Sequence, residues 1–349
     1  MKVFIPHKKD KNIYFDEIIQ YSYFEYIFDD YHNYDAQCKI VNIQFPEAIF
    51  DWQLPSKDML ADLERELQIW KSNSRIVYTM NDFKPHYKND SLYNKLFNLI
   101  YQYADGVIHL GNFSKEAYKD LFSKTCLHKV IYHPTYTSLL KNYTIKDIQE
   151  LTSFDLKDKY IVSSIGSIRS KEEMKMIFNF FKKIPKENKV LIVPRILFYK
   201  NVPNWLPYRF KKPFAKIIAY YNLFAIKKEL YYIDDKFLEY PYLVDLIKKS
   251  SLIIIPRVKN LNSGNLFLGL TFNKNMVVPN VGNIKEILSI FKIPFFNFNK
   301  INNANVADFI QTLETTNYFE VENYETIKEE FHPMKIAKSY DDFFLKFIP

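Results

Sequence analysis

The chain has 349 residues, of which 48% are hydrophobic and 25% charged, and its formal net charge is +8. This length is about twice that of a usual domain and predicts two domains, and the composition excludes long disordered or low-complexity regions. The surplus of basic residues favours an anionic partner: a phosphate compound, a nucleic acid or an acidic membrane surface.

The N-terminal sequence MKVFIPHKKDKN has too short an apolar core for a signal peptide and predicts a first strand instead. No apolar run approaches the roughly eighteen residues that a membrane-spanning helix needs. Cys38 and Cys126 lack the spacing of metal ligands or redox pairs, so both are expected to be packing residues in a reducing compartment. We therefore expect a cytoplasmic protein, attached to a membrane only at the surface of its inner face, if at all.

In the first part of the chain, short β-rich runs alternate with stretches of helical spacing, which is typical of βαβ units and a parallel sheet. The helical stretches include residues 57–71 and 92–104. The predicted strands are residues 2–6, 39–45, 75–80, 106–110 and 129–133.

A polar segment at residues 141–158 predicts a linker, and the alternation restarts after it. The second set of predicted strands is 160–166, 189–194, 230–233, 251–256 and 276–279. The predicted fold class is therefore α/β, with two doubly wound Rossmann-like domains facing a cleft, at residues 1–145 and 155–330. The last segment, 334–349, predicts a terminal helix.

Glycine is scarce and unevenly placed. Three of the six glycines lie between residues 264 and 282, namely Gly264, Gly269 and Gly282, and Gly166 ends the first predicted strand of the second domain. Ligands of open α/β sheets bind at the carboxyl ends of strands, where glycine permits tight turns and a close approach of the backbone. We expect Gly166 and Gly264 to approach a ligand, and Gly106 and Gly111 to serve as simple turns.

The segment LNSGNLFLGLTF (261–272) predicts a buried helix capped by Asn262 or Ser263. A helix N-terminus after a strand is a ready anion site, and Arg257 and Lys259 precede it. The alternative is a well-capped core helix without a ligand.

A second basic loop, SSIGSIRSKEEM (163–174), places Arg169 and Lys171 before another helix. In one parallel sheet both loops emerge at the same edge, so these cations and the helix terminus would surround a single anion, such as a phosphate or diphosphate.

Several of these segments resemble GT-B-fold bacterial glycosyltransferases of the family 4 type. SIGSIRSK (164–171) is similar to their G-x-I-R-x-x-K loop, and NSGNLFLGLTFNKNMVVPNVGNIKEIL (262–288) to their donor segment. In the first half, the strand-end sequences NIQFPEAIFDW, RIVYTMNDFKPH, ADGVIHLGNFSKEAY and KVIYHPTY also resemble theirs. The resemblance covers about residues 39–290, in the same order.

The resemblance implies a hexosyltransferase-type enzyme whose nucleotide-sugar donor binds the second domain. Uridine is favoured over guanosine, and the acceptor, a glycan or lipid-linked glycan of bacterial surface polysaccharide synthesis (capsule or O-antigen), lies against the first domain. The helix 334–349 is expected to pack back on that first domain. The expected donor-binding residues are Gly166, Arg169, Lys171, Arg257, Asn262, Ser263, Gly264 and Asn265.

The chain departs from this family at several positions. Many retaining relatives carry two glutamates eight residues apart, where this chain has Leu261 and Gly269. Asn81 stands where many carry histidine, and the basic loop is one residue short before Lys171. The stereochemical outcome is therefore left open.

The first domain offers groups that could take a proton from an acceptor hydroxyl, as an inverting transferase requires. Asp82 and Glu47 are the candidate bases, with His86 orienting acceptor or donor and Asn81 on the acceptor side. Each of them could instead be a helix cap, a surface carboxylate or a hydrogen-bonded loop residue. No D-x-D triplet occurs, so a metal-held donor is not expected, and neither is any cofactor.

The segment 204–230 mixes lysine and arginine with aromatic residues at helical spacing. A helix of this kind can lie in a membrane interface, or it can pack its aromatic residues on the sheet and leave the lysines in solvent. Two other functions stay open: a nucleotide-sugar epimerase of the same fold, and a binding protein for anions or nucleic acid. Nucleic acid is disfavoured because 48 basic residues are interspersed with 40 acidic ones.

Overall fold

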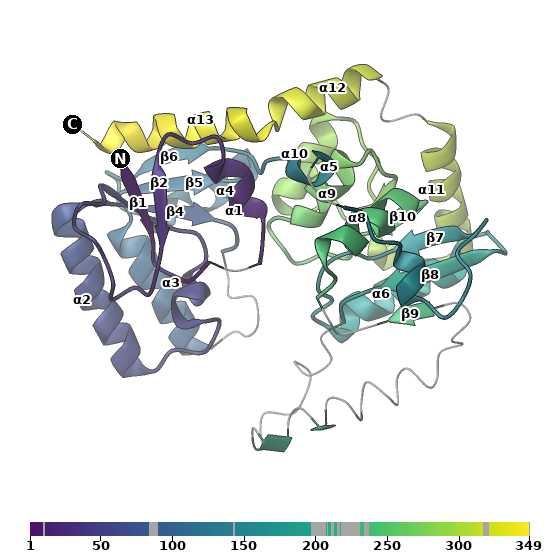
Figure 1. Cartoon of the computed structure of the whole chain (residues 1–349), viewed down its shortest axis with the longest axis horizontal. Helices are drawn as coiled ribbons and strands as arrows, with labels where there is room; N and C mark the ends of the chain where they lie inside the picture. The colour runs from purple at the N-terminus through teal and green to yellow at the C-terminus, as the bar shows by residue number, and fades with distance from the viewer. Residues whose placement is uncertain are drawn as a thin grey trace.

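The computed structural model describes residues 1–9, 11–83, 90–141, 144–196, 237–316 and 321–348, with residues 207, 209–210, 213–214, 217 and 231–233 between them. These residues form two α/β domains that lie side by side (Figure 1). Two of the sequence predictions, His86 and most of the segment 204–230, lie outside the described residues.

The first domain is built on a parallel sheet with strand order β2-β1-β3-β4-β5-β6. Its strands are β1 (Lys2–Ile5), β2 (Glu25–Phe28), β3 (Ile40–Ile43), β4 (Arg75–Met80), β5 (Gly106–His109) and β6 (Leu127–Val130). The central strands β3 and β5 are buried at every position, as expected for a sheet covered by helices on both faces. The sequence prediction missed β2, an edge strand whose residues are all at least partly exposed, so it lacks the apolar run of a buried strand.

The helices of the first domain are α1 (Tyr14–Ile19), η1 (Pro46–Phe50), α2 (Lys57–Asn73), α3 (Ser91–Tyr103), α4 (Asn112–Tyr118) and η2 (Lys119–Leu121). The amphipathic spacing of α2 explains its place, since Leu60, Leu63, Leu67 and Trp70 all turn inward. Its start is fixed by Ser56, whose side chain accepts the Met59 N–H at 3.1 Å.

The second domain carries a parallel sheet with strand order β11-β10-β7-β8-β9. Its strands are β7 (Tyr160–Ser163), β8 (Lys189–Val193), β9 (Tyr231–Ile233), β10 (Leu252–Ile254) and β11 (Met276–Val277). Its helices are α6 (Lys171–Lys183), α8 (Tyr240–Lys249), α9 (Gly264–Thr271), α10 (Gly282–Ile290), η5 (Phe298–Lys300) and α11 (Asn303–Thr315). Two parallel sheets with alternating helices confirm the predicted doubly wound fold class.

The described part of the predicted linker 141–158 contains structure of its own. It follows α5 (Ser138–Lys141) and includes the short helix η3 (Ile148–Leu151). Ile148 is buried, and its N–H donates to the Asp245 carboxylate on α8 at 2.8 Å. The predicted linker therefore contains a segment that packs against the second domain and is hydrogen-bonded to it.

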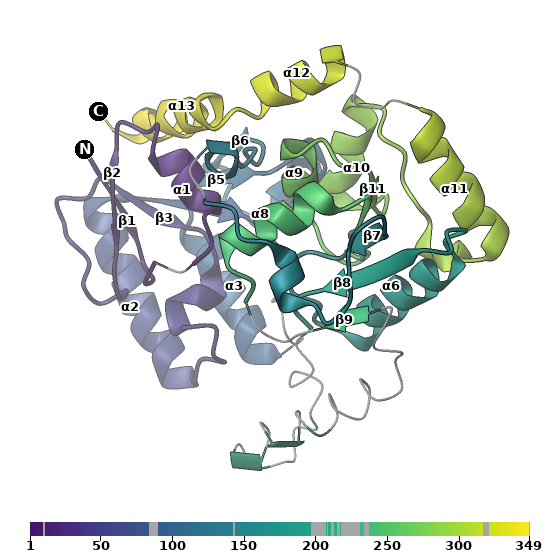
Figure 2. The same cartoon turned by 45° about the vertical axis from the view of Figure 1, so that its right-hand side comes forward.

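The chain ends in α12 (Val321–Glu330), α13 (Pro333–Phe344) and η6 (Leu345–Phe347), which run along one side of both domains (Figures 1 and 2). Helix α13 lies on the first domain and contacts α1. There Asp341 accepts hydrogen bonds from the Ser22 Oγ at 2.5 Å and from the Tyr23 N–H at 3.0 Å. Among the described residues, no helix has both the length and the hydropathy needed to cross a membrane.

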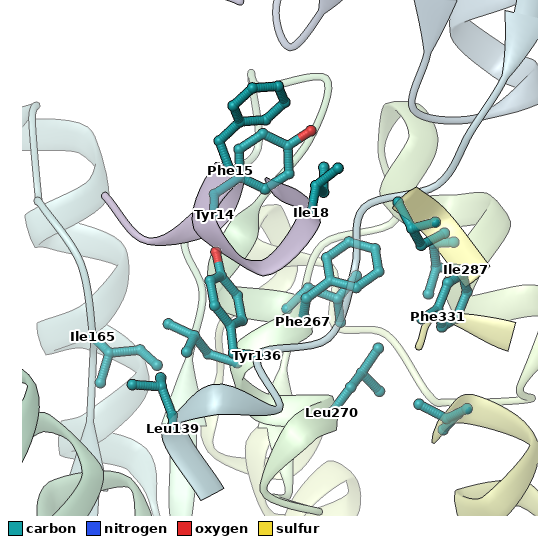
Figure 3. Close-up of a cluster of buried hydrophobic side chains, with 14 of the residues drawn as sticks. Tyr14, Phe15, Ile18, Tyr136, Leu139, Ile165, Phe267, Leu270, Ile287 and Phe331 are labelled. Atoms are coloured by element: carbon teal, nitrogen blue, oxygen red, sulfur yellow. The ribbon is translucent and has the colours of Figure 1, made fainter. Parts of the chain in front are cut away.

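One apolar cluster joins the two domains, and Figure 3 shows part of it. It combines Tyr14 and Ile18 of α1, Tyr136 after β6, Phe267 of α9 and Phe331 at the end of α12. Because interfaces of this apolar kind resist relative domain motion, the two domains are expected to hold one arrangement.

Candidate functional site

The two basic loops that were predicted to meet do so. Strands β7 and β10 are parallel neighbours, so the loops after them leave the same edge of the sheet. The Arg257 guanidinium donates to the Ser167 carbonyl at 2.5 Å, and the Asn265 side-chain amide donates to the Ile165 carbonyl at 2.5 Å. The loop after β7 is therefore tied both to the loop after β10 and to the first turn of α9.

The cations of these loops fall into two groups. Arg257 is buried and forms an ion pair with Glu173 on α6. Lys171, at the start of α6, is exposed, and Lys259 is 74% exposed and pairs with Glu172 at 2.5 Å. The N–H of Arg169 donates to Glu173 at 2.7 Å. The lysines therefore face solvent, whereas the Arg257 guanidinium holds protein groups. The donor contacts expected of Arg169, Lys171 and Arg257 stay predictions.

Ser263 holds the cap position of α9, one of the two caps predicted, but its side chain makes no capping hydrogen bond. A Cβ atom on Gly264 would lie 2.8 Å from the Tyr136 hydroxyl oxygen. Tyr136 belongs to the segment that connects the first domain to the second, so the start of α9 packs against the connection between the domains.

Protein neighbours account for the clustered glycines. Gly166 has a φ of +89° and a Cβ there would lie 2.5 Å from the Asn265 amide nitrogen, while Gly282 has a φ of +51° and a Cβ there would lie 2.7 Å from the Leu261 carbonyl oxygen. At Gly269 a Cβ would lie 2.1 Å from the Met276 sulfur. Close packing and left-handed backbone are thus sufficient reasons for glycine at these positions, and ligand approach at Gly166 and Gly264 remains an expectation.

The candidate bases of the first domain lie together at the carboxyl edge of its sheet. Asp82 follows β4, and Glu47 lies in η1 after the neighbouring strand β3. The Tyr78 hydroxyl donates to the Asp82 carbonyl at 2.8 Å. Burial, followed by the charges of Tyr101, Glu47 and Asp82, raises the pKa of Tyr78. Glu47 is only 1% exposed, whereas Asp82 is half-buried.

The predicted acceptor and donor edges touch each other. The Leu261 N–H donates to the Asp82 carboxylate at 3.3 Å, and the Asn262 side-chain amide donates to the Asn81 carbonyl at 2.7 Å. Leu261 is 2% exposed and packs in the apolar cluster of the first domain. At the position where many retaining relatives have a glutamate, this chain thus has an apolar side chain that joins the domains.

Sequence reasoning missed a second set of contacts between the domains. The Asn283 side chain accepts the Ser114 N–H at 2.9 Å and donates to the Asn262 amide oxygen at 2.8 Å. Glu286 accepts the Asn112 N–H at 2.7 Å, at the start of α4, and the Tyr132 hydroxyl at 2.7 Å. No local pattern marks these residues, because their first-domain partners, Ser114, Asn112 and Tyr132, all lie more than 150 positions away in the sequence.

Glu173 was also missed, although its sequence context carried a signal. The pattern Ser-x-x-Glu at residues 170–173 is that of a capping box before a helix. In the structure the Ser170 hydroxyl accepts the Glu173 N–H at 3.1 Å. The Glu173 side chain reaches back to the Arg169 N–H, one residue beyond the position that a capping box uses.

A buried histidine lies beside the start of α9. The His133 ring packs between Phe267 and Tyr14, with ring centroids 4.4 Å away on each side. Its Nδ1–H donates to the Pro134 carbonyl at 2.7 Å, and its Nε2 accepts from the Tyr136 hydroxyl at 3.4 Å. Burial lowers the pKa of His133 to about 3, so the imidazole is neutral at pH 7. In the described part of the chain, no group of three or more His, Cys, Asp or Glu side chains is placed to hold a metal ion.

The domain pair, with the loops of its second sheet turned toward the first domain, has the fold of GT-B glycosyltransferases. No family model and no curated protein sequence matches the chain. Among solved structures, the chain is similar to Anabaena HepE in complex with UDP-glucose, with a TM-score of 0.68 and 12% identity over 99% of this chain and 100% of that one.

Two further similar structures are synthases of sugar phosphates. Sucrose-phosphate synthase from Thermosynechococcus elongatus matches with a TM-score of 0.59 and 13% identity, over 89% of this chain and 74% of that chain. A UDP-forming α,α-trehalose-phosphate synthase from Burkholderia xenovorans matches with a TM-score of 0.56 and 11% identity, over 90% and 74%. At identities this low, the similarity shows a shared fold alone.

Proposed function

We propose that this protein is a metal-independent glycosyltransferase of the family 4 type. It would move a sugar from a nucleotide-sugar donor, with UDP favoured over GDP, to a hydroxyl of a glycan or lipid-linked glycan in bacterial surface polysaccharide synthesis. The observation that carries the proposal is a contact between the carboxyl edges of the two sheets: the loop after β10 in the second domain donates hydrogen bonds to Asn81 and Asp82 of the first. The full-length likeness to HepE, whose structure contains UDP-glucose, supports the same conclusion.

In this proposal the donor diphosphate lies at the loops after β7 and β10 and at the start of α9. Lys171 and Lys259 supply exposed positive charge there, and the backbone N–H groups at Gly264 and Asn265 supply the helix terminus. As the bond between the sugar and the diphosphate breaks, the leaving diphosphate gains negative charge, which these groups would stabilise electrostatically.

On the acceptor side, Asp82 is the better placed of the two candidate bases. Its carboxylate already accepts a hydrogen bond from the donor loop, and it is half-buried, whereas Glu47 is buried within the first domain. In an inverting reaction the acceptor oxygen would attack the anomeric carbon while its proton passes to the Asp82 carboxylate. A retaining reaction would not need this base, so Asp82→Asn separates the two outcomes.

A peripheral place at the cytoplasmic face of the membrane, with residues 204–230 in contact with lipid, belongs to the same proposal. Its support is the basic and aromatic composition of that segment. Vesicle sedimentation with and without anionic lipid, on the full chain and on a chain with the lysines of this segment replaced by glutamine, tests it.

The first experiment is a thermal unfolding series with UDP, GDP and their sugars. Ligand at about 100 times its dissociation constant adds about 2.7 kcal/mol, which raises the midpoint of a chain of this length by about 4 °C. A shift with uridine compounds alone, followed by release of UDP that depends on an added acceptor, supports the proposal. Formation of an isomeric nucleotide sugar without acceptor would assign an epimerase, and no shift with any nucleotide would contradict nucleotide-sugar chemistry.

A further inference from the structure

A single buried carboxylate connects the two loops of the donor site. Glu173 is 11% exposed in its side chain, and one of its oxygens pairs with the Arg257 guanidinium, which is 8% exposed. The other oxygen accepts the Arg169 N–H at 2.7 Å. Arg257 in turn donates to the Ser167 carbonyl at 2.5 Å. One ion pair thus fixes the backbone after β7 at two points and joins it to the loop after β10.

Stability alone is a weak reason for such a pair, because taking two charges out of water offsets much of their attraction. What the pair provides is a defined arrangement: the guanidinium is planar and both of its described contacts fix its orientation. The neighbouring residue gives a contrast. Glu172 is 49% exposed and pairs with Lys259, itself 74% exposed, in solvent, where an ion pair contributes little.

We propose that Glu173 is a positioning residue for an anionic nucleotide donor, and that Arg257 acts through Glu173 as part of the same clamp. The clamp sets the backbone course of the loop that carries Arg169 and Lys171, and the Asn265 side-chain amide at the start of α9 donates to the same loop at the Ile165 carbonyl. This inference rests on the proposed function, since it concerns the site at which the donor diphosphate would bind.

The test compares two substitutions that each remove one negative charge from adjacent positions, Glu173→Gln and Glu172→Gln. Electrostatics alone makes both variants bind UDP slightly more tightly, because a negative charge near an anion is lost. A positioning role predicts the opposite change, weaker UDP binding, in Glu173→Gln alone. We expect the dissociation constant of UDP, measured by titration calorimetry at 20 °C on the folded full chain, to rise at least about tenfold in Glu173→Gln, since one lost charge-assisted contact corresponds to that factor. It should change less than about twofold in Glu172→Gln.

A purely structural role of Glu173 would change the stability of the protein and not its affinity for UDP. It would lower the unfolding midpoint of the unliganded Glu173→Gln protein and leave the dissociation constant of the folded protein unchanged, and that result would overturn the inference. Tighter UDP binding in Glu173→Gln would also overturn it, because it would show that Arg257, once released, is itself a phosphate ligand. If activity is found, we expect the KM for the donor to rise while the KM for the acceptor stays the same.

A double variant and the wild-type titration serve as controls. If Glu173→Gln does not fold because it leaves Arg257 as a lone buried charge, the double variant Glu173→Gln with Arg257→Gln removes both charges, and the same loss of UDP affinity is expected. The wild-type titration reports on the proposed function by itself. Absence of UDP binding there rejects the function and the inference together, whereas wild-type binding that Glu173→Gln retains rejects the inference alone.

Discussion

Acidification should weaken the fold through His133, and the effect can be isolated by one substitution. The pKa of this histidine falls from 6.5 in the unfolded chain to about 3 in the folded protein, chiefly because of burial. Between these two values the unfolded state binds one more proton than the folded state, so the free energy of unfolding rises with pH in this window. The contribution of His133 to stability is therefore fully present above about pH 6.5 and is lost as the pH falls toward 3.

The size of the effect follows from the two pKa values. At pH 5 the unfolded histidine is protonated and the folded one is not, which removes about 2 kcal/mol of stability relative to pH 7.5. For a chain of this length that corresponds to about 3 °C in the midpoint. The proton would have to enter a ring packed between Phe267 and Tyr14 at the junction of the domains, so the loss should appear as a loosening of that junction.

His133→Phe keeps an aromatic ring in the stack and removes the titrating group. We expect its free energy of unfolding, from urea titrations at pH 5 and pH 7.5, to depend less on pH than that of the wild type by about 2 kcal/mol. The comparison uses the difference between the two pH values, so any constant cost of the substitution cancels. Parallel pH profiles for the two proteins would refute the reasoning.

His32 provides a control, because its effect on the pH dependence of stability has the opposite sign to that of His133. This histidine is 51% exposed, and its hydrogen bond to Asp62 raises its pKa. Its stabilising contribution is present below the unfolded pKa and is lost as the pH rises through the folded pKa. His32→Gln should therefore lose more stability at pH 5 than at pH 7.5, the reverse of His133→Phe.

Other predictions concern single contacts. Gly282→Ala should lower the free energy of unfolding by about 2 kcal/mol, because the residue has a φ of +51° and the new Cβ would lie 2.7 Å from a backbone oxygen; a change below about 0.5 kcal/mol in a urea titration would contradict this. Asn283→Ala leaves the buried Ser114 N–H without its acceptor and should cost about 1–3 kcal/mol, so an unchanged midpoint would show that water replaces it. Burial raises the pKa of Cys38 to about 11 and that of Cys126 to about 12, so a disulfide reagent at pH 8 should react with both thiols only in denaturant; fast reaction of either in the native protein would be the opposite result.

The fold class follows from the sequence alone, because alternating β-rich and helical segments are local patterns. Residues 75–80 and 106–110 were predicted as strands; the first is found as β4, and the second contains all of β5, which ends one residue earlier. The meeting of the loops that carry Arg169 and Arg257 was also predicted, since the carboxyl ends of parallel strands share an edge. The edge strand β2 was missed because partly exposed residues lack the pattern of a buried strand.

The partners of the polar groups in the site are visible only in the folded protein. Arg257 was predicted as a donor contact from its place in a basic loop, but its partner Glu173 lies 84 positions away, and no local spacing shows that the two pair. The same holds for Leu261. In the sequence it stands where a glutamate was expected from the family resemblance, and in the structure its side chain packs in the apolar core of the first domain. Such pairings depend on which strands become neighbours, and that is a property of the folded sheet.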